Sequence, residues 1–500
     1  MADKSIIIIG GGIAGLSMGA YAQMNGYRTR IFEAHDLPGG LCTAWQRSGF
    51  TINGCLHLLV GCSESSDFYT IWKELGAMQG RGFAFYEDFV SFEGSDGQIF
   101  TLHSNVDKLE AHMLELAPED SLIIGDFIKA VRQCMHFKPP ILKIPELYGL
   151  IDGIGALSRI IPHVGLLRKW GRISMAEFAK KFKCTVLREM FTHLWFPDSP
   201  VLFFMMMLSM LHQKSSGYPL GGSLDFSQAI EKRYSDLGGK CYYGVKVAKV
   251  IVENDQAVGI QLEDGSEHRA DYVISAADGY STIFKMLDGN YTNKKIHGYF
   301  ENLPIFPPLI YINFGLKQHL DLGCGNSQGI DIPLKEPLTV ADEEITRLGL
   351  RLHDFDASAA PEGKSLAKVL IPSNIAYWEA LYTDPERYQA EKMKIYDQVI
   401  AIFDERYPGF ANMIEMRDMA TPITTVRYTG NWQGSHQGWM VTANIRYPRM
   451  KNTLPGLKNF YMVGHWVEAG GGVPSAALSG RNVTQFLCKR DKKNFVTTVA

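Results

Sequence analysis

The chain has 500 residues, of which 46% are hydrophobic, so it is long and apolar enough to bury the cores of two or three interlocked domains. Its formal net charge is −3 at pH 7, which excludes the broad basic surface that nucleic-acid binding requires. The composition therefore indicates an ordinary soluble globular protein with no nucleic-acid partner.

The N-terminus and the cysteines both bear on the cellular compartment. The sequence passes from Met1–Ser5 directly into an apolar strand, so we expect no signal or transit peptide. The cysteines form no Cys-x-x-Cys pair and no cluster with histidine at zinc spacing, so we expect no metal site and mostly reduced thiols in a cytoplasmic protein. The cysteines are Cys42, Cys55, Cys62, Cys134, Cys184, Cys241, Cys324 and Cys488.

The first predicted elements form a dinucleotide-binding fingerprint. The β-branched run Ile6–Ile9 is typical of a buried parallel strand and leads into Gly10-x-Gly12-x-x-Gly15 and a helix. The glycines permit a tight turn and a close approach to a pyrophosphate, which the helix N-terminus attracts. Glu33 ends the next strand, where an acidic side chain can bind a ribose diol.

A second group of strands is predicted within residues 238–278, with turns at Asn254-Asp255 and Asp264-Gly265. A β-meander that returns to the dinucleotide domain is typical of flavin-dependent oxidases and dehydrogenases.

The third piece lies near the C-terminus. A predicted strand, Asn459–Gly464, is followed by the glycine turn Gly470–Gly472 and a small-residue helix over Ser475–Val483. Backbone N–H groups at such a turn can face the N1/C2=O edge of a reduced isoalloxazine, although an ordinary strand-loop-helix has the same pattern.

With these pieces in place, the chain resembles the phytoene desaturase-like flavoproteins, which include carotenoid isomerases and retinol saturases. The resemblance covers roughly the first 60 residues and the ranges 214–285 and 420–490. The matching motifs are Gly10-x-Gly12-x-x-Gly15 with Glu33, Tyr218–Ser223, Ala270–Asp278 and Gly470–Pro474.

The resemblance implies non-covalently bound FAD and an α/β fold. It implies a Rossmann-type FAD-binding domain of the amine oxidase-like kind, assembled from residues 1–65, 214–288 and 420–490. Residues 66–213 and 289–419 would form an α+β substrate-binding domain whose helical part can face a membrane.

The resemblance also assigns roles in binding FAD. The fingerprint glycines would face the pyrophosphate, Glu33 the adenosine ribose, the Val247 backbone the adenine, and Gly472-Val473 the flavin ring. The expected cofactor-binding residues are Gly10, Gly12, Ile13, Ala14, Gly15, Glu33, Ala34, Gly39, Gly40, Leu41, Val247, Gly464, Gly472 and Val473.

The loop after Gly39-Gly40 departs from the desaturase pattern, because Leu41 stands where arginine is usual. Retinol saturase-like members also lack this arginine and carry a histidine farther on, which corresponds to His57 near the flavin. Arg47 is a candidate for supplying the missing positive charge, and an ordinary surface-loop arginine is the alternative.

Candidate proton-handling residues are His57, His465 and Glu468, with His436 a weaker one. Each could instead be structural.

Two segments of the substrate domain could meet a lipid. The apolar run Val201–Leu211 is too short to span a bilayer, but its methionine-rich part could line a hydrocarbon tunnel, with a buried core helix as the alternative. Residues 158–172 mix basic and apolar residues and could contact an anionic membrane surface peripherally, or could be a solvated helix face. Helices predicted over Val106–Leu116 and Arg387–Tyr407 are scaffold.

The leading functional hypothesis is an FAD-dependent oxidoreductase acting on carbon-carbon single or double bonds of a hydrophobic polyene or isoprenoid, as a desaturase or a saturase. One alternative is a redox-neutral flavin-dependent cis-trans isomerase. Another is an amine oxidase-like enzyme whose aromatic cage would be formed by Trp432, Trp439 and Trp466. A third is a non-enzymatic escort of prenylated proteins, which would not need the pyrophosphate loop, Glu33 and the glycine turn Gly470–Gly472 together.

Overall fold

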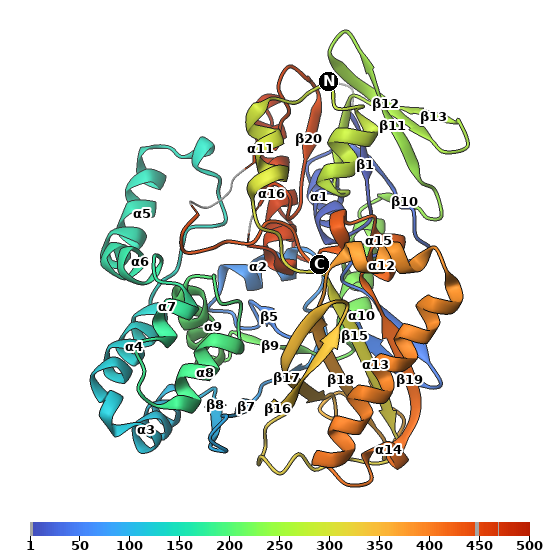
Figure 1. The fold of residues 1–500 in the computed structure, drawn as a ribbon. Helices are drawn as coiled ribbons and strands as arrows, with labels where there is room; N and C mark the ends of the chain where they lie inside the picture. Colours follow the sequence, from blue (N-terminus) through green and yellow to red (C-terminus); the bar gives the residue numbers. More distant parts are fainter. Residues whose placement is uncertain (1–3, 446–449, 469) are drawn as a thin grey trace.

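A five-stranded parallel sheet organises the part of the molecule built from both chain ends (Figure 1). The computed structural model describes residues 4–445, 450–468 and 470–500. The buried run Ile6–Ile9 makes β1 a central strand, as expected for a parallel sheet covered on both faces. The strand order is β10 (Lys240–Tyr242), β2 (Arg28–Phe32), β1 (Ser5–Ile9), β14 (Tyr272–Ser275) and β20 (Phe460–Met462).

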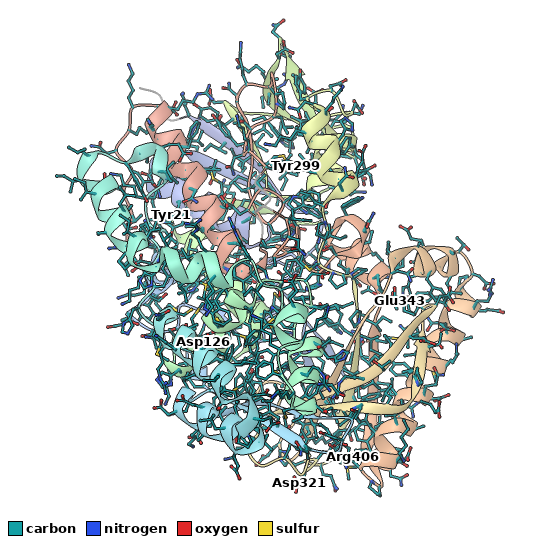
Figure 2. The ribbon with its side chains drawn as sticks, turned by 60° about the vertical axis from the view of Figure 1, so that its left-hand side comes forward. Tyr21, Asp126, Tyr299, Asp321, Glu343 and Arg406 are labelled. Atoms are coloured by element: carbon teal, nitrogen blue, oxygen red, sulfur yellow. The ribbon has the colours of Figure 1, made fainter. Side chains whose placement is uncertain are left out.

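Helices from distant parts of the sequence pack closely on this sheet. A Cβ atom built on Gly480 would lie 2.6 Å from the Met18 backbone nitrogen, so only glycine allows this contact between α1 and α16. Tyr21, labelled in Figure 2, donates to Glu74, which also pairs with the buried Arg481. The helices of this domain are α1 (Ile13–Met24), α2 (Asp67–Glu74), α10 (Gly222–Asp236), α11 (Lys294–Asn302) and α16 (Gly472–Arg490). Helix α15 (Pro422–Thr429) instead places Ile423 in the core of the seven-stranded sheet.

The predicted β-meander forms a separate antiparallel sheet before the chain returns in β14. Asn254 and Asp255 adopt left-handed φ angles of 50° and 57° at the predicted turn. Its strands are β11 (Val247–Glu253), β12 (Gln256–Leu262) and β13 (Glu267–Arg269). The Rossmann-type fold predicted from the sequence is confirmed.

A seven-stranded sheet forms most of the second part of the molecule (Figure 1). Helix α13 (Pro385–Arg406) packs Ile395, Val399 and Phe403 against one face, and the hairpin of β3 (Ala44–Arg47) and β4 (Phe50–Asn53) lies on the other. The order is β19 (Ile414–Ala420), β15 (Leu309–Leu316), β18 (Ser365–Pro372), β17 (Glu343–Leu352), β16 (Gly329–Val340), β7 (Asp88–Glu93) and β8 (Ile99–His103).

The strands of this sheet come from both segments that were predicted to form the substrate-binding domain, residues 66–213 and 289–419. The exact boundaries of the two domains stay predictions. The smaller elements are β5 (Leu59–Val60), β6 (Phe83–Ala84), β9 (Ser216–Pro219), α12 (Ile375–Tyr382) and α14 (Phe410–Met413).

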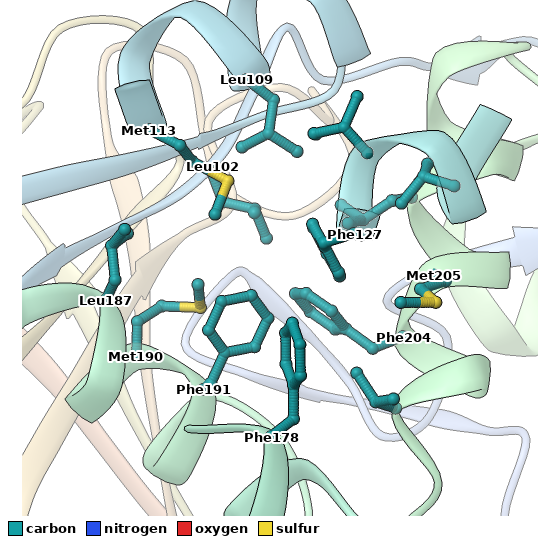
Figure 3. Packing of buried hydrophobic residues seen from close by; sticks show 14 of the residues in the cluster. Leu102, Leu109, Met113, Phe127, Phe178, Leu187, Met190, Phe191, Phe204 and Met205 are labelled. Atoms are coloured by element: carbon teal, nitrogen blue, oxygen red, sulfur yellow. The ribbon is translucent and has the colours of Figure 1, made fainter. Parts of the chain in front are cut away.

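A helical lobe has its own aromatic core (Figure 3). Phe178 and Phe191 pack edge to face with their ring centroids 4.9 Å apart, a preferred aromatic geometry. Phe204 and Met205 of α9 are also buried there, so this face of the methionine-rich segment is core rather than tunnel wall. The lobe comprises α3 (Val106–Leu116), α4 (Ser121–Cys134), α7 (Met175–Ala179), α8 (Thr185–His193) and α9 (Val201–His212).

Helices α5 (Leu150–Ile160) and α6 (Val164–Trp170) lie at the side of the molecule in Figure 1. The 21-residue stretch Leu150–Trp170 is apolar and long enough to cross a membrane by length and composition, which the sequence analysis did not identify. Its Leu150 and Ile151 side chains are 83% and 86% exposed, whereas most large apolar side chains of this fold are buried.

Candidate active site and cofactor cradle

The glycine fingerprint forms an open turn at the N-terminus of α1. Gly10 has a φ of 97°, and a Cβ atom on Gly15 would lie 2.0 Å from the Gly10 carbonyl oxygen, so both positions require glycine. The N-cap residue, Gly12, provides no side-chain cap, and the first helical turn carries no acidic residue. Backbone N–H groups are therefore available to a phosphate.

Glu33 lies beside this turn at the end of β2, as predicted. Its side chain is 8% exposed, and its two carboxylate oxygens accept hydrogen bonds from the Gly11 nitrogen at 2.5 Å and the His35 nitrogen at 2.8 Å. The Val245 nitrogen donates to the Glu33 carbonyl oxygen, which brings the start of β11 and Val247 to the same edge of the sheet. This arrangement fits an adenosine moiety with its ribose at Glu33.

The loop Gly39-Gly40-Leu41 passes directly against the fingerprint. The Gly39 nitrogen donates to the Gly11 carbonyl oxygen at 2.9 Å, and Gly39 and Gly40 have φ angles of 107° and 60°. Leu41 is half-buried and leaves this part of the cradle without a positive charge.

Arg47 does not replace that charge. Its Nε lies 3.2 Å from the Asp418 carboxylate on β19, and its side chain is 56% exposed. Trp45 donates to the same carboxylate through Nε1. The hypothesis that Arg47 supplies the cofactor's missing arginine is therefore wrong, because the β3–β4 hairpin turns it toward the seven-stranded sheet instead.

The C-terminal segment completes the cradle. A Cβ atom on Gly464 would lie 3.5 Å from that of Ala14, so the end of β20 meets the first turn of α1. Gly470, Gly471 and Gly472 have φ angles of 94°, 66° and 85°, and α16 begins at Gly472 with neither a side-chain cap nor an acidic first turn. The buried Val473 follows.

These three segments fit FAD. Two uncapped helix N-termini provide N–H donors for the pyrophosphate and for a partly anionic edge of the flavin, and Glu33 lies where the ribose would be held. The roles of the individual residues stay predictions.

His57 lies in the loop after β4, where it borders a small cavity with Arg351 and His353. Burial lowers its pKa well below the usual range, and the charges of Lys368, Arg351 and His436 lower it further. His57 is therefore uncharged at neutral pH, the form that can accept a proton.

Three polar residues of the seven-stranded sheet border this region and were missed from the sequence. In register, Arg351 pairs with Lys368, and Lys368 pairs with Asn313. The Lys368 ammonium donates to the Asn53 carbonyl oxygen at 2.5 Å, and burial lowers its pKa to about 7. The available signal was a lysine within the apolar strand SLAKVLIP.

His465, His436 and Glu468 lie near the C-terminal glycine turn. Burial lowers the pKa of both histidines to about 4, and the charge of His436 also lowers that of His465. The Glu468 nitrogen donates to the Gly464 carbonyl oxygen at 3.0 Å. Because His436 influences the pKa of both His57 and His465, the structure brings these three histidines into one region.

The three tryptophans near this turn pack on one another rather than forming an open cage. The rings of Trp439 and Trp466 meet at 88° with their centroids 5.0 Å apart, and both side chains are buried. Trp439 donates to the Trp466 carbonyl oxygen, and Trp432 stacks on Tyr280. Their geometry does not provide the pair of facing rings expected for an amine cage.

Comparisons with known proteins identify the family and the fold. A family model described as flavin containing amine oxidoreductase matches residues 13–487. The chain is 23% identical to a chloroplastic prolycopene isomerase of Arabidopsis thaliana over 95% of this chain and 81% of that one. It is 22% identical to a neurosporene-forming phytoene desaturase of Rhodobacter capsulatus over 96% and 93%.

A crystal structure of an oxidoreductase from Methanosarcina mazei has the same fold, with a TM-score of 0.59 and 17% identity over 96% of this chain and all of the other. The matched model covers nearly the whole sequence and begins at Ile13, within the glycine fingerprint. The chain belongs to the family of flavin-containing amine oxidoreductases.

Proposed function

We propose that the protein is an FAD-dependent oxidoreductase that acts on a carbon-carbon single or double bond of a hydrophobic polyene or isoprenoid. The observation that carries the proposal is a complete three-segment cradle beside a buried aromatic wall. Similarity along 96% of the chain to an enzyme named for neurosporene formation supports a polyene substrate.

Some residues around the cradle exclude water, and another can transfer a proton. Bound FAD supplies the hydride chemistry. The cluster of Trp439, Trp466 and Phe300 forms an apolar wall that keeps water from this side of the cradle. His57 is uncharged at neutral pH and can accept the proton that leaves the substrate or return one.

The most direct test is to purify the protein, record its absorbance spectrum and identify co-purifying lipids by mass spectrometry. A yellow protein with flavin absorbance and a bound polyene is expected. A colourless protein that binds no added FAD would contradict the proposal and favour the escort hypothesis.

Redox-neutral cis-trans isomerisation is a second candidate. Similarity over 95% of the chain to a prolycopene isomerase favours it. The two activities differ in stoichiometry, so an anaerobic assay with reduced flavin separates them. Isomerisation without net consumption of donor identifies the isomerase, and a change in the number of double bonds identifies the oxidoreductase.

We further propose that the protein works in the cytoplasm and contacts a membrane peripherally through α5 and α6. The exposed apolar side chains of Leu150, Ile151, Ile154 and Leu157 lie on one helical segment, with Arg159 and Arg168 farther along it. An apolar face accompanied by basic residues suits the interface of an anionic bilayer, from which a lipid substrate could be collected. The charges favour a helix that lies on the bilayer over one that crosses it.

A further inference from the structure

A row of polar side chains crosses the seven-stranded sheet on the face turned toward the β3–β4 hairpin. Arg351 of β17 lies opposite Lys368 of β18, which lies opposite Asn313 of β15. Residues paired in this way project from the same face of the sheet. Two basic side chains therefore stand side by side in the interior, an arrangement that is destabilising while both are charged and that an anion between them would stabilise.

The nearby carboxylates of the chain are already engaged elsewhere. Asp331 binds Arg347 at 2.6 Å, and Asp418 binds Arg47 and Trp45. Within the described residues, neither Arg351 nor Lys368 has a carboxylate at salt-bridge distance. The single hydrogen bond from Lys368 goes to a neutral carbonyl oxygen, that of Asn53.

Unpartnered polar atoms occur in the same region. Both ring nitrogens of His353, a side chain only 4% exposed, lack a hydrogen-bond partner, and so do both amide atoms of the fully buried Asn313. Buried polar groups normally have partners, so these groups point to a polar ligand.

A cavity of about 20 Å³ lies among His57, Arg351 and His353. That volume accommodates a group somewhat larger than one water molecule rather than a whole substrate. Phe89, Leu352 and Phe355 add apolar lining, and Tyr86 and Gln328 complete it with two further polar side chains. The cavity therefore suits a small polar group held among both polar and apolar side chains.

We propose that Arg351 and Lys368, with His353, form a subsite that binds an ionised carboxylate at one end of the substrate. Arg351 and Lys368 would donate charge-assisted hydrogen bonds to the two oxygens, and the anion would separate the paired cations. The inference rests on the proposed polyene substrate and narrows it to polyene acids. His57, on the same cavity, then lies at the carboxylate end of the chain.

The test compares a C20 polyene carboxylic acid with its methyl ester, which differs in having no negative charge. Dissociation constants are measured on the FAD-loaded protein by tryptophan fluorescence, for wild type, Lys368→Met, Arg351→Met and the control Lys364→Met. Lys364 immediately precedes the same strand, but its ammonium pairs with Glu415 away from the cavity. Flavin content and melting temperature are recorded for each variant.

The dissociation constant of wild type for the acid should be at least about tenfold lower than its dissociation constant for the ester. Lys368→Met and Arg351→Met should each bring the ratio of the two affinities close to one while ester binding stays unchanged, and Lys364→Met should retain the preference for the acid. Equal binding of acid and ester by wild type would overturn the subsite and leave the proposed function intact. If neither ligand binds the FAD-loaded protein, both the subsite and the polyene proposal fail.

The pH dependence gives a readout that remains decisive if a variant misfolds. Arg351, Cys55, His57 and His353 face Lys368, and burial holds the pKa of Lys368 at about 7. Because Lys368 loses its charge above this value, wild-type affinity for the acid should fall as the pH rises from 6 to 9, and affinity for the ester should not. Parallel pH profiles for the two ligands would contradict the proposal.

Discussion

Glu33 is the residue whose role in cofactor binding can be isolated most cleanly. Its carboxylate accepts two backbone N–H groups at the end of β2. In Glu33→Gln, the amide NH2 would face one of these donors and could no longer accept from it, so FAD should bind at least about tenfold more weakly, or ~1.4 kcal/mol. Fluorescence titration with FAD measures the change.

Glu263→Gln is the matched control, since Glu263 forms an exposed pair with Lys246 on the β-meander. Unchanged FAD affinity in Glu33→Gln, with the control also unchanged, would show that Glu33 does not contribute to the cofactor site.

Leu41 and His57 separate cofactor anchoring from chemistry. Leu41→Arg should leave FAD affinity within about twofold, because the backbone N–H groups at the uncapped N-terminus of α1 already provide donors for the pyrophosphate. His57→Ala should retain FAD but lower turnover by about 100-fold, a typical contribution of an acid-base group. Steady-state kinetics and flavin content measure both effects, and the reverse pattern would overturn this division.

Sequence patterns predicted the residues of the cofactor cradle but not the row of Arg351, Lys368 and Asn313 across the seven-stranded sheet, for a physical reason. Both glycine turns carry their signal locally, because each lies between a strand and a helix, and Glu33 stands directly at the end of a strand. Arg351, Lys368 and Asn313 come together only through the register in which three strands pair. The same pairing decides that Arg47 binds Asp418 rather than the cofactor.

At the scale of elements, α5 tests the proposed membrane contact. Replacing Leu150 and Ile151 together with asparagine should lower binding to vesicles containing phosphatidylglycerol by about tenfold, because two exposed apolar side chains would no longer enter the bilayer interface. Cosedimentation with vesicles measures this.

Leu122→Asn is the control, because Leu122 is 89% exposed on α4, outside the α5–α6 segment. Equal vesicle binding by wild type and the double variant would contradict the contact through α5.

The observed ends of helices agree with the predicted ends where the local sequence pattern is strong. Helix α3 occupies Val106–Leu116 as predicted, with Asn105 as its N-cap. The predicted helix over Ser475–Val483 is longer, because α16 starts at Gly472 and continues to Arg490. The length of the helical segment Leu150–Trp170 was underestimated because its basic residues interrupt the apolar run, although the chain stays helical from α5 through a 3-10 turn into α6.

At the scale of the whole molecule, buried histidines should make stability depend on pH. His436 and His465 have pKa values of about 4 in the folded protein against 6.5 when unfolded. Between these values the unfolded chain binds more protons, so their contribution is fully present above pH 6.5 and is lost as the pH falls toward 4. The loss should reach about 3 kcal/mol for each histidine at pH 4.

Melting curves between pH 4 and 7 measure this effect. The double variant His436→Gln and His465→Gln should lose less stability over this range than wild type, whereas His319→Gln, at an exposed site, should follow wild type. Identical slopes for wild type and the double variant would show that the two histidines are not held uncharged by burial.

The proposed reaction is a redox reaction between bound FAD and a polyene, and anaerobic single-turnover spectroscopy follows both partners at once. FAD-loaded protein, oxidised or pre-reduced, is mixed with a hydrophobic polyene while visible absorbance and products are followed. We expect the flavin either to be reduced or to be oxidised, with one double bond gained or lost in the polyene per flavin. An unchanged flavin and an unchanged polyene in both directions, alongside bleaching by a primary amine, would contradict it.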